Sequence, residues 1–288
     1  MENFNKTIVV ASGKGGTGKT LLSVSLARYF ADQNAQVHYI DADVEEPNGG
    51  ILLQPQNTKT TDVFTEVPEL QADTCSACGK CQQFCAFNAI IAIPGKGVMV
   101  FPELCHGCPG CVDVCPEDVL KMVPRKIGTI TNGKSENIDF TEGRLNEGEA
   151  MPTPVLTSLF DYTRDYEGLK IIDSPPGTSC SVMKSMEEGD LIVLTTEPTP
   201  FGFHDVRLAS ELALKIGKPV YAVINRSDLG NSEKMKKYFY EKNIPVLGEI
   251  PFSKEVAVSY SKGQIPDNDD FVEIIEKIAQ KIVKEAEK

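Results

Sequence analysis

The chain has 288 residues, enough for two ordinary domains or for one large domain that carries an insertion. Apolar residues make up 41% and charged residues 24%, which excludes a disordered or collagen-like chain. The formal net charge of -12 disfavours binding to nucleic acid or to anionic membranes, because the summed field repels phosphate groups. No run approaches the roughly 18 apolar residues of a membrane span, and the start lacks a basic segment followed by an apolar one. We therefore expect a cytoplasmic protein.

Short apolar runs that end in polar residues recur along the chain and predict strands. The first, 6–11, leads through a glycine-rich turn into a predicted helix over 21–30. The later runs are 36–40, 169–173, 190–195 and 220–224, with helices predicted over 205–216 and 233–241. Buried parallel strands have such continuous apolar runs, so the pattern predicts a doubly wound, mostly parallel α/β sheet. In such sheets, ligands bind at the carboxyl ends of the strands.

The alternation of strands and helices is interrupted for roughly a hundred residues, which indicates an inserted domain. We place its boundaries near Leu53 and Ala150, so that 1–53 and 151–288 form one discontinuous domain and 54–150 the insertion. Residues 126–149 predict a return hairpin that leads to a helix near 155–162. The last helix, 271–286, has one apolar face and a mixed charged face, which predicts packing on the core rather than on a membrane.

Residues 13–20 read GKGGTGKT and fit the phosphate-binding motif G-x-x-x-x-G-K-[ST] between a strand and a helix. The glycines let backbone N–H groups face a phosphate, Lys19 reaches the β- and γ-phosphates, and Thr20 offers its hydroxyl to Mg²⁺. A chance glycine turn is the alternative, and the flanking strand and helix argue against it. The predicted contacts with the nucleotide, ATP, are Gly13, Gly15, Gly16, Thr17, Gly18, Lys19 and Thr20.

A second lysine in this loop, Lys14, makes it the deviant phosphate loop. Here the chain resembles the MinD, ParA, Mrp and nitrogenase iron-protein group of ATPases. The resemblance implies an ATP-dependent homodimer, or a heterodimer with a similar protein, in which Lys14 crosses to the partner's nucleotide. By itself the sequence shows only an added cation near the phosphates, and a solvated surface lysine is the alternative.

Acidic residues follow two of the predicted core strands. By the same resemblance, Asp41 and Asp43 match the first switch, where Asp43 positions or activates the attacking water and Asp41 lies near the magnesium shell. Asp173 matches the Walker B aspartate, which holds Mg²⁺ through water, and Gly177 can turn its backbone toward the γ-phosphate. A helix cap is the alternative for any single one of these carboxylates, and it weakens where a phosphate loop occupies the same edge.

The resemblance also assigns three residues to the adenine base. Asn225 ends a predicted strand and matches the residue that reads adenine, and Pro251 and Phe252 fall where the family closes over the base. A turn-forming asparagine is the alternative at position 225.

Eight of the nine cysteines form two runs with the spacing C-x2-C-x2-C-x3-C. This repeat predicts two [4Fe-4S] clusters, since each run supplies three thiolates to one cluster and its fourth cysteine to the other. The expected ligands are Cys75, Cys78, Cys81 and Cys115 for the first cluster, and Cys105, Cys108, Cys111 and Cys85 for the second. Zinc is the alternative, but zinc pairs usually come as C-x2-C with four ligands per ion.

This segment resembles a bacterial two-cluster ferredoxin with a core at about 68–124. Ala86 stands where a proline would normally follow the first run. This difference from the ferredoxin pattern bears on the reduction potential of the cluster that uses Cys85. His106 either donates a hydrogen bond to a cluster sulfur or is an exposed loop residue. The remaining cysteine, Cys180, stands where the nitrogenase iron protein has a cluster ligand, but no second cysteine is free, so we expect a buried, inert thiol.

The whole chain resembles MinD-superfamily ATPases with an inserted ferredoxin domain, often labelled as similar to cobyrinic acid a,c-diamide synthase. That activity is not expected, because no room is left for a glutaminase domain. We expect ATP-dependent gating of electron transfer to or from a partner protein, whose identity and direction of electron flow the sequence does not specify. The alternative is an Mrp-like carrier that assembles or delivers iron-sulfur clusters or metal cofactors. A positioning ATPase is disfavoured by the acidic charge and the lack of a basic membrane helix.

Overall fold

The computed structural model describes residues 4–71 and 74–287, so residues 72 and 73 of the expected ferredoxin core lie outside the described part. Nine strands of this part form one large sheet: β1 (Thr7–Ser12), β2 (Val37–Asp41), β3 (Gln56–Leu70), β6 (Leu120–Ser135), β7 (Ile138–Leu145), β8 (Leu169–Pro176), β9 (Leu191–Thr196), β10 (Val220–Asn225) and β11 (Val246–Ile250). Their order across the sheet is β11-β10-β9-β1-β8-β2-β7-β6-β3.

The strands from β11 to β7 are all parallel to their neighbours, whereas β6 and β3 are antiparallel additions at one edge. Every residue of β2, β9 and β10 is buried, which is why apolar residues predominate in these strands. The predicted doubly wound, mostly parallel α/β sheet is therefore confirmed.

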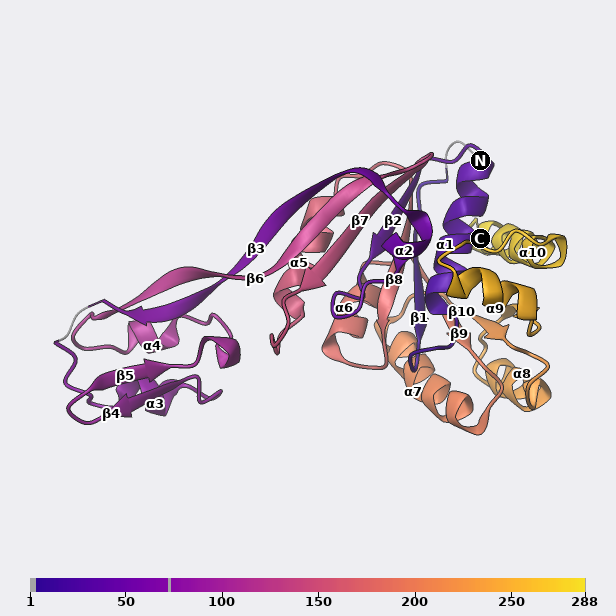
Figure 1. The fold of residues 1–288 in the computed structure, drawn as a ribbon. Helices are drawn as coiled ribbons and strands as arrows, with labels where there is room; N and C mark the ends of the chain where they lie inside the picture. The colour runs from indigo at the N-terminus through magenta and orange to yellow at the C-terminus, as the bar shows by residue number, and fades with distance from the viewer. Residues whose placement is uncertain (1–3, 72–73, 288) are drawn as a thin grey trace.

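Helices cover both faces of this sheet (Figure 1). Alternate residues of β1 enter two separate cores, with Ile8 and Val10 in one and Val9 and Ala11 in the other. The first core is covered by α1 (Lys19–Asp32), α2 (Gly49–Leu53), α9 (Lys254–Ser261) and α10 (Asp269–Ala286). The second is covered by α5 (Thr153–Thr163), α6 (Cys180–Glu187), α7 (Pro200–Ile216) and α8 (Ser232–Glu241).

One helix begins earlier than the sequence predicts. The start of α7 is Pro200 rather than residue 205, because the Thr199 side chain accepts a hydrogen bond from the Gly202 N–H and caps the helix. A proline at the first helical position has no N–H to leave unpaired, so it suits this place. The elements around the phosphate loop are thus tied closely to the ends of β9 and β1.

The predicted return hairpin is present as β6 and β7, but it is part of the main sheet rather than a separate piece of the insertion. Strand β7 pairs in parallel with β2, and β6 pairs with both β7 and β3. Ile127 and Ile130 of β6 enter one core while Ile138 and Phe140 of β7 enter the other, and this burial holds the hairpin on the sheet. The main sheet thus continues through residues that the sequence analysis assigns to the insertion.

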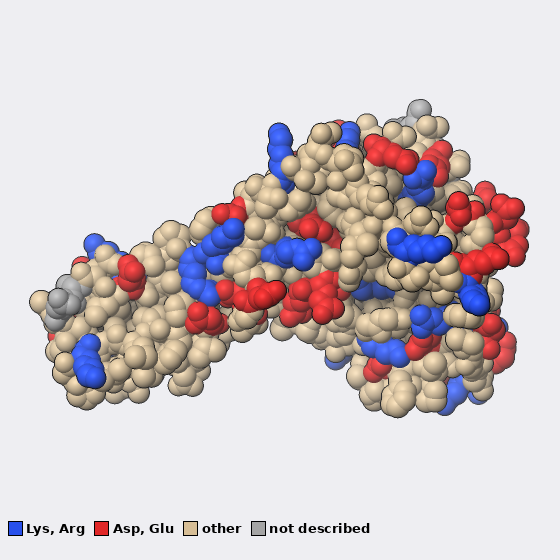
Figure 2. Space-filling model, viewed as in Figure 1, with Lys and Arg blue, Asp and Glu red and all other residues tan. Residues whose placement is uncertain are grey.

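The far ends of β3 and β6 form a long two-stranded ribbon that carries a small module away from the helices (Figure 1). This module contains α3 (Lys80–Phe84), β4 (Ile90–Ile93), β5 (Gly97–Val100), a 3-10 turn η1 (Pro102–Leu104) and α4 (Gly110–Asp113). Its own core is small, with Cys81, Ile90, Cys111 and Leu120 buried together. Figure 2 shows acidic and basic side chains gathered where the ribbon meets the body of the protein.

The C-terminal helix α10 packs on the core, as the sequence predicts. Its buried residues are Phe271, Ile275, Ile278, Ala279 and Ile282, all on one face. Among the described helices, none combines the length and the apolar character that crossing a membrane requires.

Candidate functional site

The phosphate loop joins β1 to α1, so that the N-terminus of α1 faces the loop. Gly16 and Gly18 have φ angles of 79° and 90°, in the left-handed region that favours glycine. A Cβ on Gly13 would lie 2.3 Å from the Asp205 carbonyl oxygen, so that position also requires glycine. Thr17 is 1% exposed, and its Oγ1 has no hydrogen-bond partner within the described chain. A buried, unpaired hydroxyl in this loop fits an anionic ligand with acceptor oxygens.

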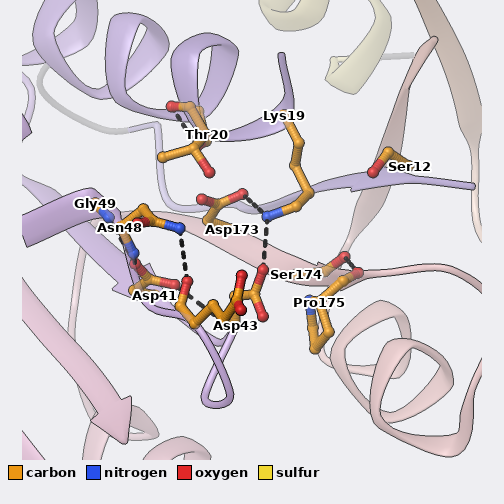
Figure 3. A network of polar contacts seen from close by, with 12 residues as sticks. Ser12, Lys19, Thr20, Asp41, Asp43, Asn48, Gly49, Asp173, Ser174 and Pro175 are labelled. Carbon is orange, nitrogen blue, oxygen red and sulfur yellow. Dashed lines mark hydrogen bonds and ion pairs between the residues drawn. The ribbon is translucent and has the colours of Figure 1, made fainter. Parts of the chain in front are cut away.

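Lys19 lies at the centre of the carboxylates that the sequence predicts (Figure 3). Its Nζ is 2.7 Å from Asp173 Oδ1 and 3.7 Å from Asp43 Oδ2. Burial lowers the pKa of Lys19, but the charges of Asp173, Asp43 and Asp41 outweigh burial and raise the pKa above its ordinary value. The ammonium group is therefore charged before any nucleotide binds.

Asp41 organises the loop that carries Asp43. Its Oδ1 accepts the Asp43 N–H at 3.1 Å, and its Oδ2 accepts the N–H groups of Asn48 and Gly49 at 3.0 and 2.8 Å (Figure 3). Burial and the nearby Asp173 carboxylate nonetheless raise the pKa of Asp41 to about 8. Burial likewise raises the pKa of Asp43 to about 6, against the opposing effect of Lys19.

This group fits a magnesium ion that keeps its water ligands. Three carboxylates surround one ammonium, and Mg²⁺ prefers such hard oxygen ligands together with phosphate and water. Within the described residues, no three side chains of His, Cys, Asp or Glu converge closely enough to hold one ion directly. Contact of Asp173 with the ion through water stays a prediction. Thr20 lies beside the group at the start of α1 (Figure 3).

Gly177 has φ 97° and open space around its Cα, as a glycine that moves would need. Its N–H, however, donates to the Ser12 carbonyl oxygen at 2.9 Å. The predicted turn of this backbone toward a γ-phosphate therefore requires that hydrogen bond to break.

Lys14 forms an ion pair within its own chain instead of pointing freely into solvent. Its Nζ is 2.6 Å from Glu197 Oε1, and Arg226 Nη1 is 3.0 Å from Glu197 Oε2. Burial raises the pKa of Glu197, but the hydrogen bonds and charges of Lys14 and Arg226 outweigh it and lower the pKa. The sequence analysis missed Glu197, although it directly follows a predicted strand whose carboxyl end lies at the nucleotide edge.

The residues assigned to adenine line one cavity of about 300 Å³ beside the phosphate loop. The Asn225 amide nitrogen donates to the Thr17 carbonyl oxygen at 2.9 Å, so Asn225 joins the strand end to the loop. Pro251 and Phe252 form part of the wall, and Phe252 is 46% exposed. Other lining residues that the sequence analysis did not single out are Leu21, Arg226, Val256, Ala257 and Tyr260.

The eight clustered cysteines surround two small apolar hollows. One hollow is lined by Cys75, Cys78, Cys81 and Cys115, and the other by Cys85, Cys105, Cys108 and Cys111. The grouping is the one that the spacing predicts, with the fourth cysteine of each run at the hollow of the other run. Each hollow thus draws its thiols from both runs, which is the arrangement expected for two [4Fe-4S] clusters, and zinc stays the alternative.

Burial is the main effect on three of these thiols. It raises the pKa of Cys81 and Cys105, and that of Cys111 to about 11. Neutral thiols in apolar surroundings become good ligands only when a cationic metal centre compensates the thiolate charge. Cluster binding by these residues stays a prediction.

His106 is exposed, and its ring stacks on Phe87 with centroids 3.4 Å apart and planes 8° from parallel. Both rings border the second hollow. Cys180, in contrast, corrects our expectation of a buried thiol, because it is exposed at the start of α6. The buried face of α6 consists of Ser181, Val182, Ser185 and Met186, and position 180 lies on the opposite side of the helix.

Comparisons with known proteins identify the family and the fold. Residues 8–266 match the family described as the CobQ/CobB/MinD/ParA nucleotide binding domain. An uncharacterized protein of Methanocaldococcus jannaschii is 30% identical over 283 residues, covering 96% of this chain and 97% of that protein. An iron-sulfur cluster carrier protein of Rickettsia bellii is 25% identical, and the match covers 91% of this chain and 66% of that protein.

Among solved structures, the septum site-determining protein MinD of Pyrococcus horikoshii, complexed with Mg-ADP, has a TM-score of 0.60 at 17% identity. The match covers 98% of this chain and 97% of that one. At this identity the likeness concerns the fold alone.

Proposed function

The chain belongs to the CobQ/CobB/MinD/ParA family of nucleotide-binding domains, and from this premise we propose that it binds and hydrolyses ATP and thereby gates electron transfer through two [4Fe-4S] clusters. One observation carries the proposal. The module with two four-cysteine hollows is attached by strands of the same sheet as β2, the strand that ends at Asp41 and leads to Asp43. A module attached through β7 and β6 to the strand that leads into the first switch can respond when that switch moves.

In the ATPase reaction, the loop residues bind the phosphates and the carboxylates handle the metal and the water. Backbone N–H groups of the loop and Lys19 would neutralise the phosphate oxygens, and Thr20 and, through water, Asp173 are the residues that would hold Mg²⁺, which would polarise the γ-phosphate. Asp43, 3.7 Å from the Lys19 ammonium, orients the water that attacks the γ-phosphate. The products are ADP and phosphate. The Mg-ADP complex of the MinD structure supports nucleotide and magnesium as the ligands.

We place Lys14 at the interface of an ATP-dependent dimer, either a homodimer or a heterodimer with a similar protein. In the single chain, Glu197 holds the Lys14 ammonium at 2.6 Å. Lys14 can contact a partner's nucleotide only when it leaves Glu197, so dimer formation exchanges one anionic partner for another. The Lys14 side chain is 31% exposed, so little desolvation opposes this exchange.

The two cysteine hollows are the proposed cluster sites. Each cluster, when bound, supplies one-electron chemistry, and each electron taken from a one-electron donor protein passes to a one-electron acceptor protein. The chain's own contribution is to hold the clusters in apolar surroundings and to limit solvent access through Phe84 and Phe87, which border the second hollow.

A second candidate function is an assembly or carrier ATPase that delivers clusters. The similarity to the iron-sulfur cluster carrier protein of Rickettsia bellii favours it. Eight cysteines in two complete sets favour permanent clusters instead, because a carrier must release its cluster readily. Transfer of clusters to an apoprotein within minutes would support the carrier function over electron transfer.

The test is an anaerobic redox titration followed by EPR, with and without MgATP, on cluster-loaded wild type and on Asp43→Asn. The variant should bind ATP without turnover. If ATP gates the redox centres, MgATP shifts a midpoint potential by about 60 mV or more, which is at least tenfold for a one-electron couple. Unchanged potentials in a protein that binds ATP would contradict the gating.

A further inference from the structure

Arg125 joins the cysteine module to the body of the protein. It lies on β6 in register with Thr65 of β3, where the ribbon leaves the body. Its Nη1 and Nη2 donate to Glu149 Oε2 and Oε1 at 3.0 and 2.5 Å, and its Nη2 lies 3.6 Å from Glu103 Oε1. Glu149 belongs to the segment between β7 and α5, whereas Glu103 belongs to η1 of the module. The planar guanidinium of Arg125 therefore forms a bidentate contact with Glu149 on the body side and an ion pair with Glu103 on the module side.

On the module side, this contact leads directly to a cysteine of the second hollow. Cys105 follows η1, the turn that contains Glu103. Two residues on, Gly107 has φ 65°, and a Cβ there would lie 3.2 Å from the Glu66 carbonyl oxygen and from Thr65 Oγ1. The loop from Cys105 is thus seated on β3 at the level of Arg125, so the second hollow is the one next to the ribbon.

On the body side, the contact leads to the loop of the nucleotide site. The Glu149 N–H donates to the Asn146 carbonyl oxygen at 3.3 Å. The N–H of Leu145, which precedes Asn146, donates to the Val44 carbonyl oxygen at 2.8 Å, and Val44 follows Asp43. Val44 is 1% exposed, so it cannot shift without moving what packs on it.

We propose that Arg125 is a positioning residue that transmits the nucleotide state of the Asp43 loop to the Cys105 loop. The proposal rests on the proposed function and names the contact through which ATP reaches the second cluster. A displacement of the Asp43 loop moves the end of β7 and, with it, Glu149. The side chain of Arg125, which contacts both Glu149 and Glu103, carries that movement to η1. The route is contiguous, and its moving element is the switch loop. If the role of Arg125 were purely structural, Arg125 would hold the module in place, but the Cys105 loop would not respond to nucleotide.

The experiment is hydrogen exchange by mass spectrometry on the cluster-loaded full chain, with and without the magnesium complex of a non-hydrolysable ATP analogue. Peptides over residues 101–110 report on the Cys105 loop. The variants are Arg125→Gln, which removes the charge, and Arg125→Lys, which keeps the charge but not the two-pronged contact. Arg144→Gln is the matched control, since Arg144 lies on β7 and pairs with Glu142 of the same strand. Redox potentials are measured on the same samples.

In the wild type and in Arg144→Gln, we expect the ATP analogue to change the rate of amide hydrogen exchange over residues 101–110 by about fivefold or more. A fivefold change is at the lower end of typical allosteric coupling. In both Arg125 variants we expect unchanged iron content and nucleotide binding, with that response lost. If the wild-type loop does not respond, or if both Arg125 variants respond as the wild type does, the proposal is wrong. A loop response that depends on Arg125 without any change in potential would refute gating of electron transfer and leave the role of Arg125 intact.

Discussion

At the scale of single residues, the nucleotide site gathers three carboxyl groups around a single cationic side chain. Asp41, Asp43 and Asp173 share one ammonium, that of Lys19. The pKa of Asp41 is raised to about 8 and that of Asp43 to about 6, chiefly by burial. A cation bound among these carboxylates would lower the pKa values of Asp41 and Asp43.

This crowding predicts a pH dependence of stability in nucleotide-free protein. The folded pKa of Asp43 lies above its ordinary value of 3.8, so the folded state binds more protons than the unfolded state between pH 3.8 and about 6. The contribution of Asp43 to the free energy of unfolding is therefore largest at low pH and declines as the pH rises through that window. The decline is roughly 2–3 kcal/mol for a pKa shift of about two units. Asp43→Asn should flatten the pH dependence of the free energy of unfolding, measured in urea between about pH 4 and 6.

The control for this measurement is Glu46→Gln, which removes an exposed carboxylate from the same loop and should keep the wild-type pH profile. If the pH profile of Asp43→Asn paralleled that of the wild type, burial would not raise the pKa of Asp43 as proposed.

The Lys14–Glu197 pair predicts an effect on assembly. Glu197→Gln removes the anion that holds Lys14 in the single chain, so ATP-dependent dimers should form at about fivefold lower concentration, equivalent to about 1 kcal/mol for a partly exposed ion pair. Sedimentation with MgATP measures this change. Glu211→Gln, on the exposed face of α7, is the control, and Lys14→Ala should abolish the dimer. A dimer affinity unaffected by Glu197→Gln would contradict the proposed exchange of partners.

At the scale of elements, α10 closes one face of the sheet, and its packing on β11 is close. A Cβ on Gly248 of β11 would lie 2.6 Å from Ile278 Cγ1, so the helix lies directly on the strand. Ile278 is 0% exposed, which makes it a central contact of this face.

We predict that Ile278→Ala lowers the free energy of unfolding by about 2–5 kcal/mol, because it leaves a cavity that close packing cannot refill. Denaturant unfolding followed by circular dichroism checks this value. Val272→Ala on the same helix, where the side chain is 44% exposed, should cost well under half as much. Equal losses would indicate that helix propensity, not burial, dominates at both positions.

At the scale of the whole molecule, the nucleotide site lies at the centre of the large sheet, whereas the cysteine module lies beyond its β3 edge. The nucleotide site lies at the carboxyl ends of β1, β2 and β8, and the cysteine module lies at the far end of the β3–β6 ribbon (Figure 1). The two hollows differ in their neighbours. The hollow near the ribbon is bordered by Phe84, Phe87 and Met122, whereas the other is bordered by Lys80 and Glu117. Different surroundings give clusters different potentials.

The crossed cysteine sets predict which cluster each substitution removes. Cys115→Ser should eliminate the cluster of the Cys75 run and spare the cluster of its own run, lowering iron from about eight to about four atoms per chain. Iron and sulfide analysis with EPR measures this loss. Cys180→Ser is the control, because Cys180 is exposed and borders neither hollow. Loss of the Cys105-run cluster instead would show that the sets are not crossed.

Much of the site could be predicted from the sequence, because it depends on local spacing. The phosphate loop needs glycines and a lysine within eight residues, and parallel strands such as β9 and β10 need continuous apolar runs. The cysteine sets are likewise determined by intervals of two or three residues, which is why the predicted grouping agrees with the two hollows.

The tertiary structure alone decided the features that depend on distant pairing. The return hairpin joins the main sheet because β7 lies beside β2, just over a hundred residues earlier in the chain, as the Val37–Ile138 pair shows. Glu197 meets Lys14 and Arg226, and Arg125 meets Glu149, because the sheet brings separate strand ends and loops together. Periodicity within a segment reports which of its residues face a core, but it carries no information on which distant segment supplies the partner.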